Sequence, residues 1–184
     1  MRKVILSVLG HDRPGIVAAV SRILLEKDCN IENVSQTILQ TQFAGIFIVS
    51  LPEDLALGRL RTSLEDGLRS LNLHVHVKPL ASQTTTSPPV PNEPFVITTQ
   101  GPDRKGLVAG ITEIIAAYGA NITNLQAVFK GGDDPGDNIM IYEVDIPTDI
   151  DQQCLYRDLR QRAESLALDI SIQHRNIFEA LNRI

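Results

Sequence analysis

The sequence is poor in the residues that cross-link or anchor a chain. Two cysteines among 184 residues, Cys29 and Cys154, are too few for a disulfide scaffold, and we expect both to be reduced thiols. No stretch approaches the roughly 20 apolar residues that a membrane-spanning helix requires. The N-terminus lacks the long apolar run and the small-residue cleavage site of a signal peptide. We therefore expect a cytoplasmic protein.

An excess of positive charge is also missing. The formal net charge is −5. Residues 1–81 hold 9 Lys and Arg against 8 Asp and Glu, and residues 94–184 hold 8 against 13. A domain that binds nucleic acid needs a basic surface to neutralise phosphates. Since neither half has such an excess, we expect no direct binding to nucleic acid.

One segment between the two halves has the composition of a linker. Residues 80–94 contain four prolines and five serines and threonines, with almost no apolar side chain to bury. Proline fixes φ and removes a hydrogen-bond donor, so such a segment is semi-extended. We predict a first domain over residues 1–80, a linker over 81–93 and a second domain over 94–184 that ends in a short helix over 176–183.

The two halves repeat one another. Residues 10–33 and 101–124 are identical at 10 of 24 positions, and later apolar positions align after a further shift of four residues. The shift places an insertion at residues 131–137. Two copies of one domain of about 80 residues explain the pattern.

Apolar spacing predicts the same order of elements in each copy, strand–helix–strand–strand–helix–strand. We expect a reversal near Gly45 between the second and third strands. This order is that of the ferredoxin-like βαββαβ unit, an α+β fold whose antiparallel sheet carries both helices on one face. The predicted elements are residues 4–9, 16–24, 30–41, 44–51, 57–71 and 74–77 in the first copy, and 95–99, 107–118, 121–130, 138–146, 155–166 and 169–172 in the second.

The loop between the first strand and the first helix carries the chemistry. Gly10 suits a tight turn with positive φ, and Asp12 is a candidate helix cap. Pro14 and Gly15 suit the first helical turn, where Gly15 leaves the unpaired N–H groups open. With the partial positive charge of a helix N-terminus, this loop suits a small carboxylate. The alternative is a helix start without a ligand, but the repetition of the motif in both copies favours a binding site.

The motif of residues 10–17 with Asn30 and Ile31, repeated at 101–108 with Asn121 and Ile122, resembles the ACT domain. Members of that family are small ferredoxin-like modules that bind amino acids and regulate metabolism. The resemblance implies domains paired side by side, with ligands between the loop of one domain and the second strand of its neighbour. Carried over by position, it implies these ligand-binding residues: Gly10, His11, Asp12, Pro14, Gly15, Asn30, Ile31, Asp103, Arg104, Lys105, Gly106, Asn121 and Ile122.

The same resemblance implies a regulatory protein that is not an enzyme and uses no cofactor. It implies glycine as the ligand, and as partner a protein that regulates transcription of glycine cleavage genes. Free sheet edges and an uncovered sheet face favour a homodimer. In the second copy Lys105 stands in place of Pro14, and Pro102 in place of His11, so we expect the two sites to differ in affinity or one of them to be structural only.

Other signals favour structural roles. His74 and His76 project from one strand face but lack further ligands, so we interpret them as solvated rather than metal-binding. The acidic insertion at 131–137 lacks the spacing of a calcium loop. Cys29 suits packing, and Cys154 has no His or Asp at catalytic spacing. Two alternatives stay open: an interaction module without a working ligand site, and an enzyme that uses His11 and Asp12.

Overall fold

A computed structural model describes residues 2–80, 91–129 and 138–177. The chain divides into two compact units, Met1–Thr84 and Thr85–Ile184. Most of the predicted linker, the insertion at 131–137 and all but the start of the predicted C-terminal helix lie outside the described residues, so the predicted domain boundaries stay predictions.

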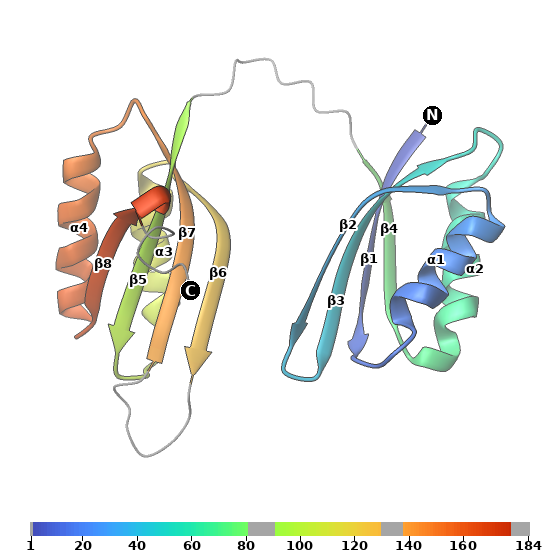
Figure 1. Cartoon of the computed structure of the whole chain (residues 1–184), viewed down its shortest axis with the longest axis horizontal. Coiled ribbons are helices and arrows are strands. Elements are labelled where there is room, and N and C mark those ends of the chain that lie inside the picture. Colours follow the sequence, from blue (N-terminus) through green and yellow to red (C-terminus); the bar gives the residue numbers. More distant parts are fainter. Residues whose placement is uncertain (1, 81–90, 130–137, 178–184) are drawn as a thin grey trace. The chain divides into compact units, whose positions relative to one another are not determined.

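The first unit has the predicted order of elements (Figure 1). Its strands and helices are β1 Arg2–His11, α1 Ile16–Glu26, β2 Asn30–Leu39, β3 Gln42–Leu51, α2 Leu57–Leu68, the short 3₁₀ helix η1 Arg69–Leu71 and β4 His74–Pro79. The strands form one antiparallel sheet in the order β2-β3-β1-β4.

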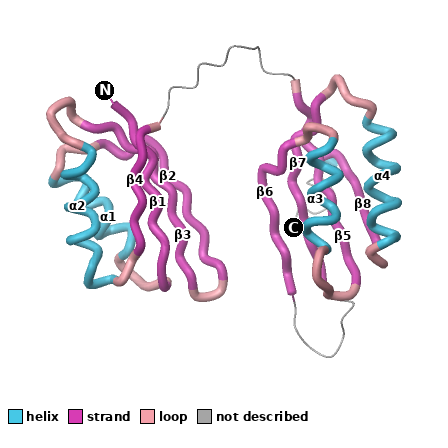
Figure 2. The backbone as a smooth tube through the Cα atoms, turned by 180° about the vertical axis from the view of Figure 1, so that it is seen from behind, coloured by secondary structure: helices cyan, strands magenta, loops and turns pink. Residues whose placement is uncertain are grey.

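The second unit repeats this plan (Figure 2). Its elements are β5 Asn92–Gly101, α3 Leu107–Ala117, β6 Asn121–Phe129, β7 Asn138–Pro147, α4 Gln152–Ser165 and β8 Asp169–His174. The sheet order is β6-β7-β5-β8, again antiparallel. In each unit the two helices lie on one face of the sheet, which confirms the ferredoxin-like fold.

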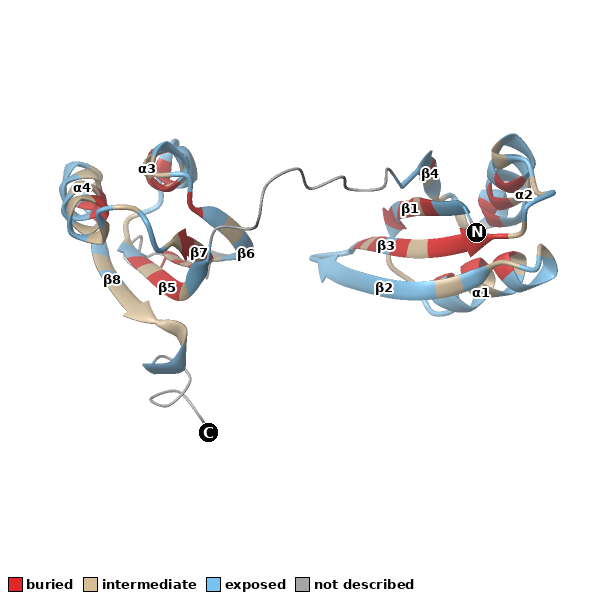
Figure 3. Ribbon diagram, turned by 90° about the horizontal axis from the view of Figure 1, so that it is seen from above, coloured by how far each residue is buried: buried red, intermediate tan, exposed pale blue. Residues whose placement is uncertain are grey.

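The core of each unit lies between the sheet and its helices. In β1, Val4, Leu6 and Val8 are buried while the residues between them are more exposed, as expected of a strand with one covered face (Figure 3). Phe47 of β3 and Leu64 of α2 belong to the same cluster. Each such side chain contributes about 1.5–3 kcal/mol when it is fully buried. Cys29 packs against this cluster, as predicted.

The predicted reversal near Gly45 is wrong. The β2–β3 turn lies at Gln40 and Thr41, and Gln40 adopts a positive φ of 55°. Gly45 lies inside β3, opposite Gln36. A Cβ atom at this position would lie 2.9 Å from the Phe43 ring, so glycine is needed there to make room for an aromatic side chain.

None of the helices in the described parts of the chain is long and apolar enough to cross a membrane.

Candidate functional site

The loop before α1 is built around Gly15 rather than Asp12. Gly15 is the N-cap residue, with a left-handed φ of 97°, and no side chain caps the helix. The predicted capping role of Asp12 is therefore wrong, as is the predicted place of Gly15 in the first helical turn. Left-handed backbone costs a residue with a Cβ atom about 1–2 kcal/mol, which explains the glycine.

Gly10 has a different role from the predicted one. It lies at the extended end of β1, and the positive-φ glycines among the described residues are Gly15, Gly106 and Gly119. A Cβ atom on Gly10 would lie 2.7 Å from Cδ2 of Leu73. Gly10 therefore allows the start of β4 to approach β1, and it does not line the cavity described next.

A cavity of about 190 Å³ opens where the loop, α1 and the edge of the sheet meet. A cavity of about 150 Å³ can hold a molecule as large as benzene, so this one is large enough for a small amino acid. Of the predicted ligand residues, only Asp12 and Gly15 line it. The lining residues are Asp12, Arg13, Gly15, Ile16, Val17, Ala18, Gln36 and Phe43.

Sequence reasoning missed two cavity residues that come from the sheet, Gln36 of β2 and Phe43 of β3. Phe43 is 2% exposed and packs in the core. Gln36 is the polar member of an alternating series in which Val34 and Ile38 are apolar. That interruption was the available signal, because the apolar Val34 and Ile38 mark one face of the strand and Gln36 is a polar residue on that same face.

The cavity offers partners for both ends of an amino acid. The first hydrogen bond within α1 runs from the N–H of Ala19 to the carbonyl of Gly15 at 2.9 Å, so the N–H groups of the preceding residues have no partner within the helix. These groups and the Arg13 guanidinium suit a carboxylate. The carboxylate of Asp12 and the side-chain carbonyl of Gln36 suit an ammonium group.

Two hydrogen bonds fix the shape of this cavity. The backbone N–H of Asp12 donates to the carbonyl of Thr41 at 2.8 Å, which holds the loop against the β2–β3 turn. Nη2 of Arg13 donates to the carbonyl of Leu71, which holds the loop against the end of η1. Nε of Arg13 is buried without a partner. The loop is therefore preformed, and one N–H of the Arg13 guanidinium has no partner.

Several predicted site residues lie elsewhere in the first unit. His11 is exposed and follows Gly10 on β1, so it points to the opposite face of the sheet from Phe43. Pro14 is exposed in the turn and does not line the cavity. Asn30 begins β2, six residues from Gln36, a separation of about 20 Å along a strand. Asn30 and Ile31 therefore do not reach this cavity within their own unit, and their predicted contact with a neighbouring domain stays a prediction.

The loop of the second unit repeats the backbone geometry. Gly106 is the N-cap residue of α3, with a φ of 91° and no side-chain cap. Asp103, Arg104 and Lys105 are exposed, whereas Asp12 and Arg13 are half-buried. Asn121 and Ile122 begin β6, the place that Asn30 and Ile31 take in β2. The two loops therefore differ in exposure, and the expectation that the two sites differ in ligand binding stays a prediction.

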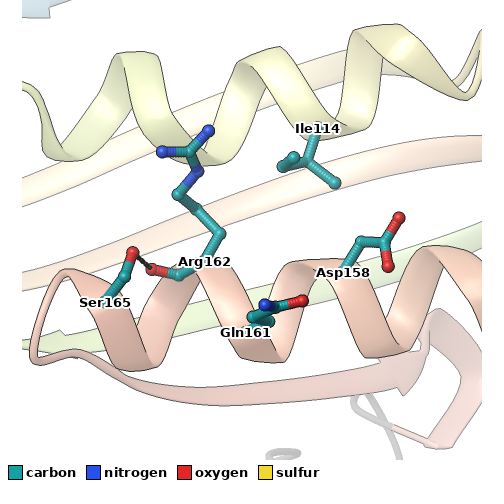
Figure 4. A pocket seen from close by; sticks show the side chains of 5 residues that line it. All are labelled: Ile114, Asp158, Gln161, Arg162 and Ser165. Atoms are coloured by element: carbon teal, nitrogen blue, oxygen red, sulfur yellow. Dashed lines mark hydrogen bonds between the residues drawn. The ribbon is translucent and has the colours of Figure 1, made fainter.

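A larger hollow of about 340 Å³ lies between α3 and α4 (Figure 4). The Arg162 side chain extends from α4 toward α3, and its stem lies over Gly110. Beside the hollow, the hydroxyl of Tyr118 donates to Asp158 at 2.6 Å. This hydrogen bond lowers the pKa of Asp158 and is the largest cause that raises the pKa of Tyr118 to about 12. The repeated loop motif does not contribute to this hollow, which is a groove between two packed helices.

His74, His76 and Cys154, which the sequence favours as structural residues, do not line the cavity. His74 and His76 lie on β4 opposite Leu9 and Ser7 of β1, and both are exposed. In the described ranges, no group of three or more His, Cys, Asp or Glu could hold a metal ion. The Cys154 thiol donates to Oδ2 of Asp151 at 3.1 Å, close to the N-cap of α4.

Comparison with known sequences yields a match in both units. The sequence model of the ACT domain matches residues 2–78 and 93–173. A UPF0237 protein of Methanopyrus kandleri is 42% identical over 79 residues, which are 42% of this chain and 88% of the relative. A UPF0237 protein of Methanocaldococcus jannaschii is 38% identical over 79 residues, with the same shares of the two chains.

Two solved structures resemble almost the whole chain. A protein from Galdieria sulphuraria described as an unknown protein is 25% identical, with a TM-score of 0.76, and the match covers 94% of this chain and 98% of that one. A protein with the provisional name of glycine cleavage system transcriptional repressor is 17% identical, with a TM-score of 0.68, and covers 94% and 96% of the two chains. At that identity, the second likeness shows the fold alone.

Proposed function

Because the chain belongs to the ACT domain family, with one domain in each unit, we propose that it is a regulatory protein that binds a small amino acid in the cavity at the start of α1. The observation that carries the proposal is the helix start at Gly15. It has no side-chain cap, and it opens onto a cavity that contains an acid, a base and an amide. An amino acid zwitterion satisfies each of these groups.

The size of the cavity favours a small ligand. About 190 Å³ is below the roughly 300–1,000 Å³ of pockets that take drug-sized molecules. The buried ring of Phe43 lines the cavity and leaves little room for a ligand side chain. Glycine is therefore the first ligand to test at this site.

The proposal extends to a protein partner. Ligand binding regulates a partner only if the ligand binds two states of the protein with different affinity. We infer that the partner is a regulator of transcription, and that the regulated genes serve glycine cleavage or related amino-acid metabolism. The support is the fold shared with the repressor-named protein, together with the suitability of the cavity for glycine. The cytoplasm is the compartment in which such a partner is met.

The proposal includes no catalytic step. Among the residues that line the cavity there is no Ser, Thr, Cys or His to act as a nucleophile or as a general base near neutral pH. If the protein were an enzyme that used His11 and Asp12, substitution of either residue by alanine would abolish turnover. The proposal instead expects no turnover of the bound amino acid by the unmodified chain.

Thermal unfolding of the full chain against each of the twenty amino acids tests the proposal. A ligand at 100 times its dissociation constant adds about 2.7 kcal/mol to stability, which raises the midpoint by several degrees. Glycine or another small amino acid is expected to raise the midpoint, and Asp12→Ala to remove the effect, with Asp103→Ala as the matched variant in the second unit. No shift at millimolar ligand would favour an interaction module without a working site.

A further inference from the structure

Asn138, the first residue of β7, is buried without hydrogen-bond partners. It is 4% exposed, and neither Nδ2 nor Oδ1 of its side chain has a partner. Buried amides are almost always paired, because an unpaired polar group in an apolar interior is costly. The Asn138 amide has lost its contact with water and has no hydrogen bond in its place, so its presence needs an explanation.

The register of the two sheets shows what Asn138 replaces. In the first unit Gly10 lies opposite Phe43, and in the second Gly101 lies opposite Asn138. Residues directly opposite one another share a face of the sheet, so Asn138 occupies the place of the Phe43 ring that lines the first cavity. The corresponding helix start is Gly106, where a Cβ atom would meet nothing within 4 Å.

The polar residue near the helix start lies on different strands in the two units. In the first unit Gln36 of β2 lies opposite Gly45, and in the second Ala127 of β6 lies opposite Met140. The first unit thus has a polar Gln36 beside an apolar Phe43. The second unit has the opposite arrangement. An apolar Ala127 stands at the position of Gln36, and a polar Asn138 stands at the position of Phe43.

Packing does not require the amide. The Phe43 ring lies over Gly45, whereas the second unit has the fully buried Met140 at the position of Gly45. In β3 the large side chain stands at Phe43 and the glycine at Gly45. In β7 the large side chain stands at Met140, the position of Gly45, and it fills volume that Phe43 fills in the first unit. An apolar residue at position 138 would bury no unpaired amide, whereas a polar group of a ligand would give the Asn138 amide the partners that it lacks.

We propose that Asn138 determines the specificity of the second site, and that this site selects an amino acid whose side chain carries a hydroxyl or a carboxamide. The Asn138 amide offers both donors and an acceptor. A hydroxyl or a carboxamide can satisfy both, and the side chains of glycine and alanine can satisfy neither. This inference rests on the proposed function, because the loop at Gly106 must hold the common ammonium and carboxylate groups.

The test compares the full chain with its Asn138→Leu variant, by thermal unfolding and by calorimetric titration with L-serine, L-asparagine, glycine and L-alanine. Without ligand, Asn138→Leu is expected to raise the unfolding midpoint by about 4 °C, because the unpaired amide is removed. Its affinity for L-serine or L-asparagine is expected to fall by about tenfold or more, the value of one hydrogen bond of moderate strength. Glycine binding is expected to stay unchanged.

Two further variants keep the outcome decisive. Phe43→Leu, the matched change in the first unit, removes a well-packed ring and is expected to lower the midpoint. Asn138→Ala, which introduces no larger side chain, is expected to lose binding of L-serine and L-asparagine if Asn138→Leu does not fold.

A lower midpoint in a folded Asn138→Leu variant, or unchanged affinity for the polar amino acids in that variant or in Asn138→Ala, would overturn the inference and assign Asn138 a structural role. If glycine binding were lost in Asp12→Ala while Asn138→Leu had no effect on any ligand, the proposed function would stand and this inference alone would fail. If the unmodified chain bound none of the four amino acids, both would fail.

Discussion

The backbone N–H of Asp12 donates a hydrogen bond to the backbone carbonyl of Thr41 at 2.8 Å. This contact joins the loop before α1 to the β2–β3 turn and does not use the Asp12 side chain. The fold therefore holds the loop in place by its backbone, while the carboxylate of Asp12 stays available to the cavity. Substitution of the Asp12 side chain should therefore change ligand binding without changing the fold.

Asp12→Ala is expected to fold as the unmodified chain does and to bind its ligand poorly. The free energy of unfolding should change by less than about 0.5 kcal/mol, because no described hydrogen bond of the side chain is lost. Ligand affinity should fall by about ten- to a hundredfold, since a hydrogen bond to a charged group contributes about 1.5–3 kcal/mol. Chemical denaturation and calorimetric titration measure the two quantities, and a large loss of stability would contradict the backbone role of the loop.

Gly15→Ala is expected to reduce both stability and binding. The left-handed φ of 97° costs an alanine about 1–2 kcal/mol, and its Cβ atom projects into open space at the cavity. Gly106→Ala should lose similar stability at a φ of 91° without affecting binding to the first unit. Gly58→Ala, in an exposed turn of α2, is the control, and it should not destabilise the chain. Equal effects of all three substitutions on glycine binding would argue against a site at Gly15.

Gly101→Ala is expected to destabilise the chain more than Gly10→Ala. A Cβ atom on Gly101 would lie 2.7 Å from the backbone carbonyl oxygen of Ala167. On Gly10 the contact of the same length is with the end of the Leu73 side chain, which can move. Overpacking costs about 1–3 kcal/mol, so we place Gly10→Ala at the lower end and Gly101→Ala at the upper end. The two midpoints of denaturant unfolding test this order, and the reverse order would contradict it.

The hydrogen bond between Tyr118 and Asp158 predicts a pH dependence of stability. The bond lowers the pKa of Asp158 from 3.8, so its contribution is present above that value and is lost as the pH falls. The pKa of Tyr118 is raised from 10.0 to about 12, so the same contribution is lost as the pH rises through that range. Tyr118→Phe should therefore destabilise the protein most between about pH 4 and pH 10.

Tyr156→Phe is the matched control for the acid limb of this profile. The Tyr156 hydroxyl donates to the neutral side chain of Gln152 at 3.2 Å, and that side chain donates in turn to Glu93, so the effect of Tyr156→Phe should change less between pH 3 and pH 6 than that of Tyr118→Phe. Urea unfolding at several pH values measures both variants. A pH-independent effect of Tyr118→Phe would show that the carboxylate of Asp158 is not its partner in solution.

The fold could be predicted from the sequence because its signals are local and occur twice. The alternation of Val4, Leu6 and Val8 and the helical spacing of Ile16, Val20 and Leu24 each specify one covered face. The turn at Gln40 could not be placed, because Gly45 has the commoner turn residue but is needed for packing against Phe43. Local composition does not distinguish a glycine in a turn from one that makes room for a ring.

The site was predicted only in part for a similar reason. The loop residues Asp12 and Gly15 belong to a contiguous motif, and both line the cavity, while their contact with a ligand stays a prediction. Gln36 and Phe43 reach the cavity through strand register, which depends on the position of a turn and of a β-bulge after Ile31. Gly10 lies in the motif but serves the approach of Leu73, since contiguity in sequence does not show which side of a loop faces a ligand.

An NMR titration of the full chain with glycine tests the central claim most directly. If glycine binds at the start of α1, the amide resonances of Gly15 to Ala18 and the side-chain amide of Gln36 will shift in a saturable way, and the shifts will vanish in Asp12→Ala. Shifts confined to the groove at Asp158 and Arg162 would contradict the account. The absence of shifts at 10 mM glycine, a concentration that corresponds to a binding free energy of roughly 3 kcal/mol, would contradict it as well.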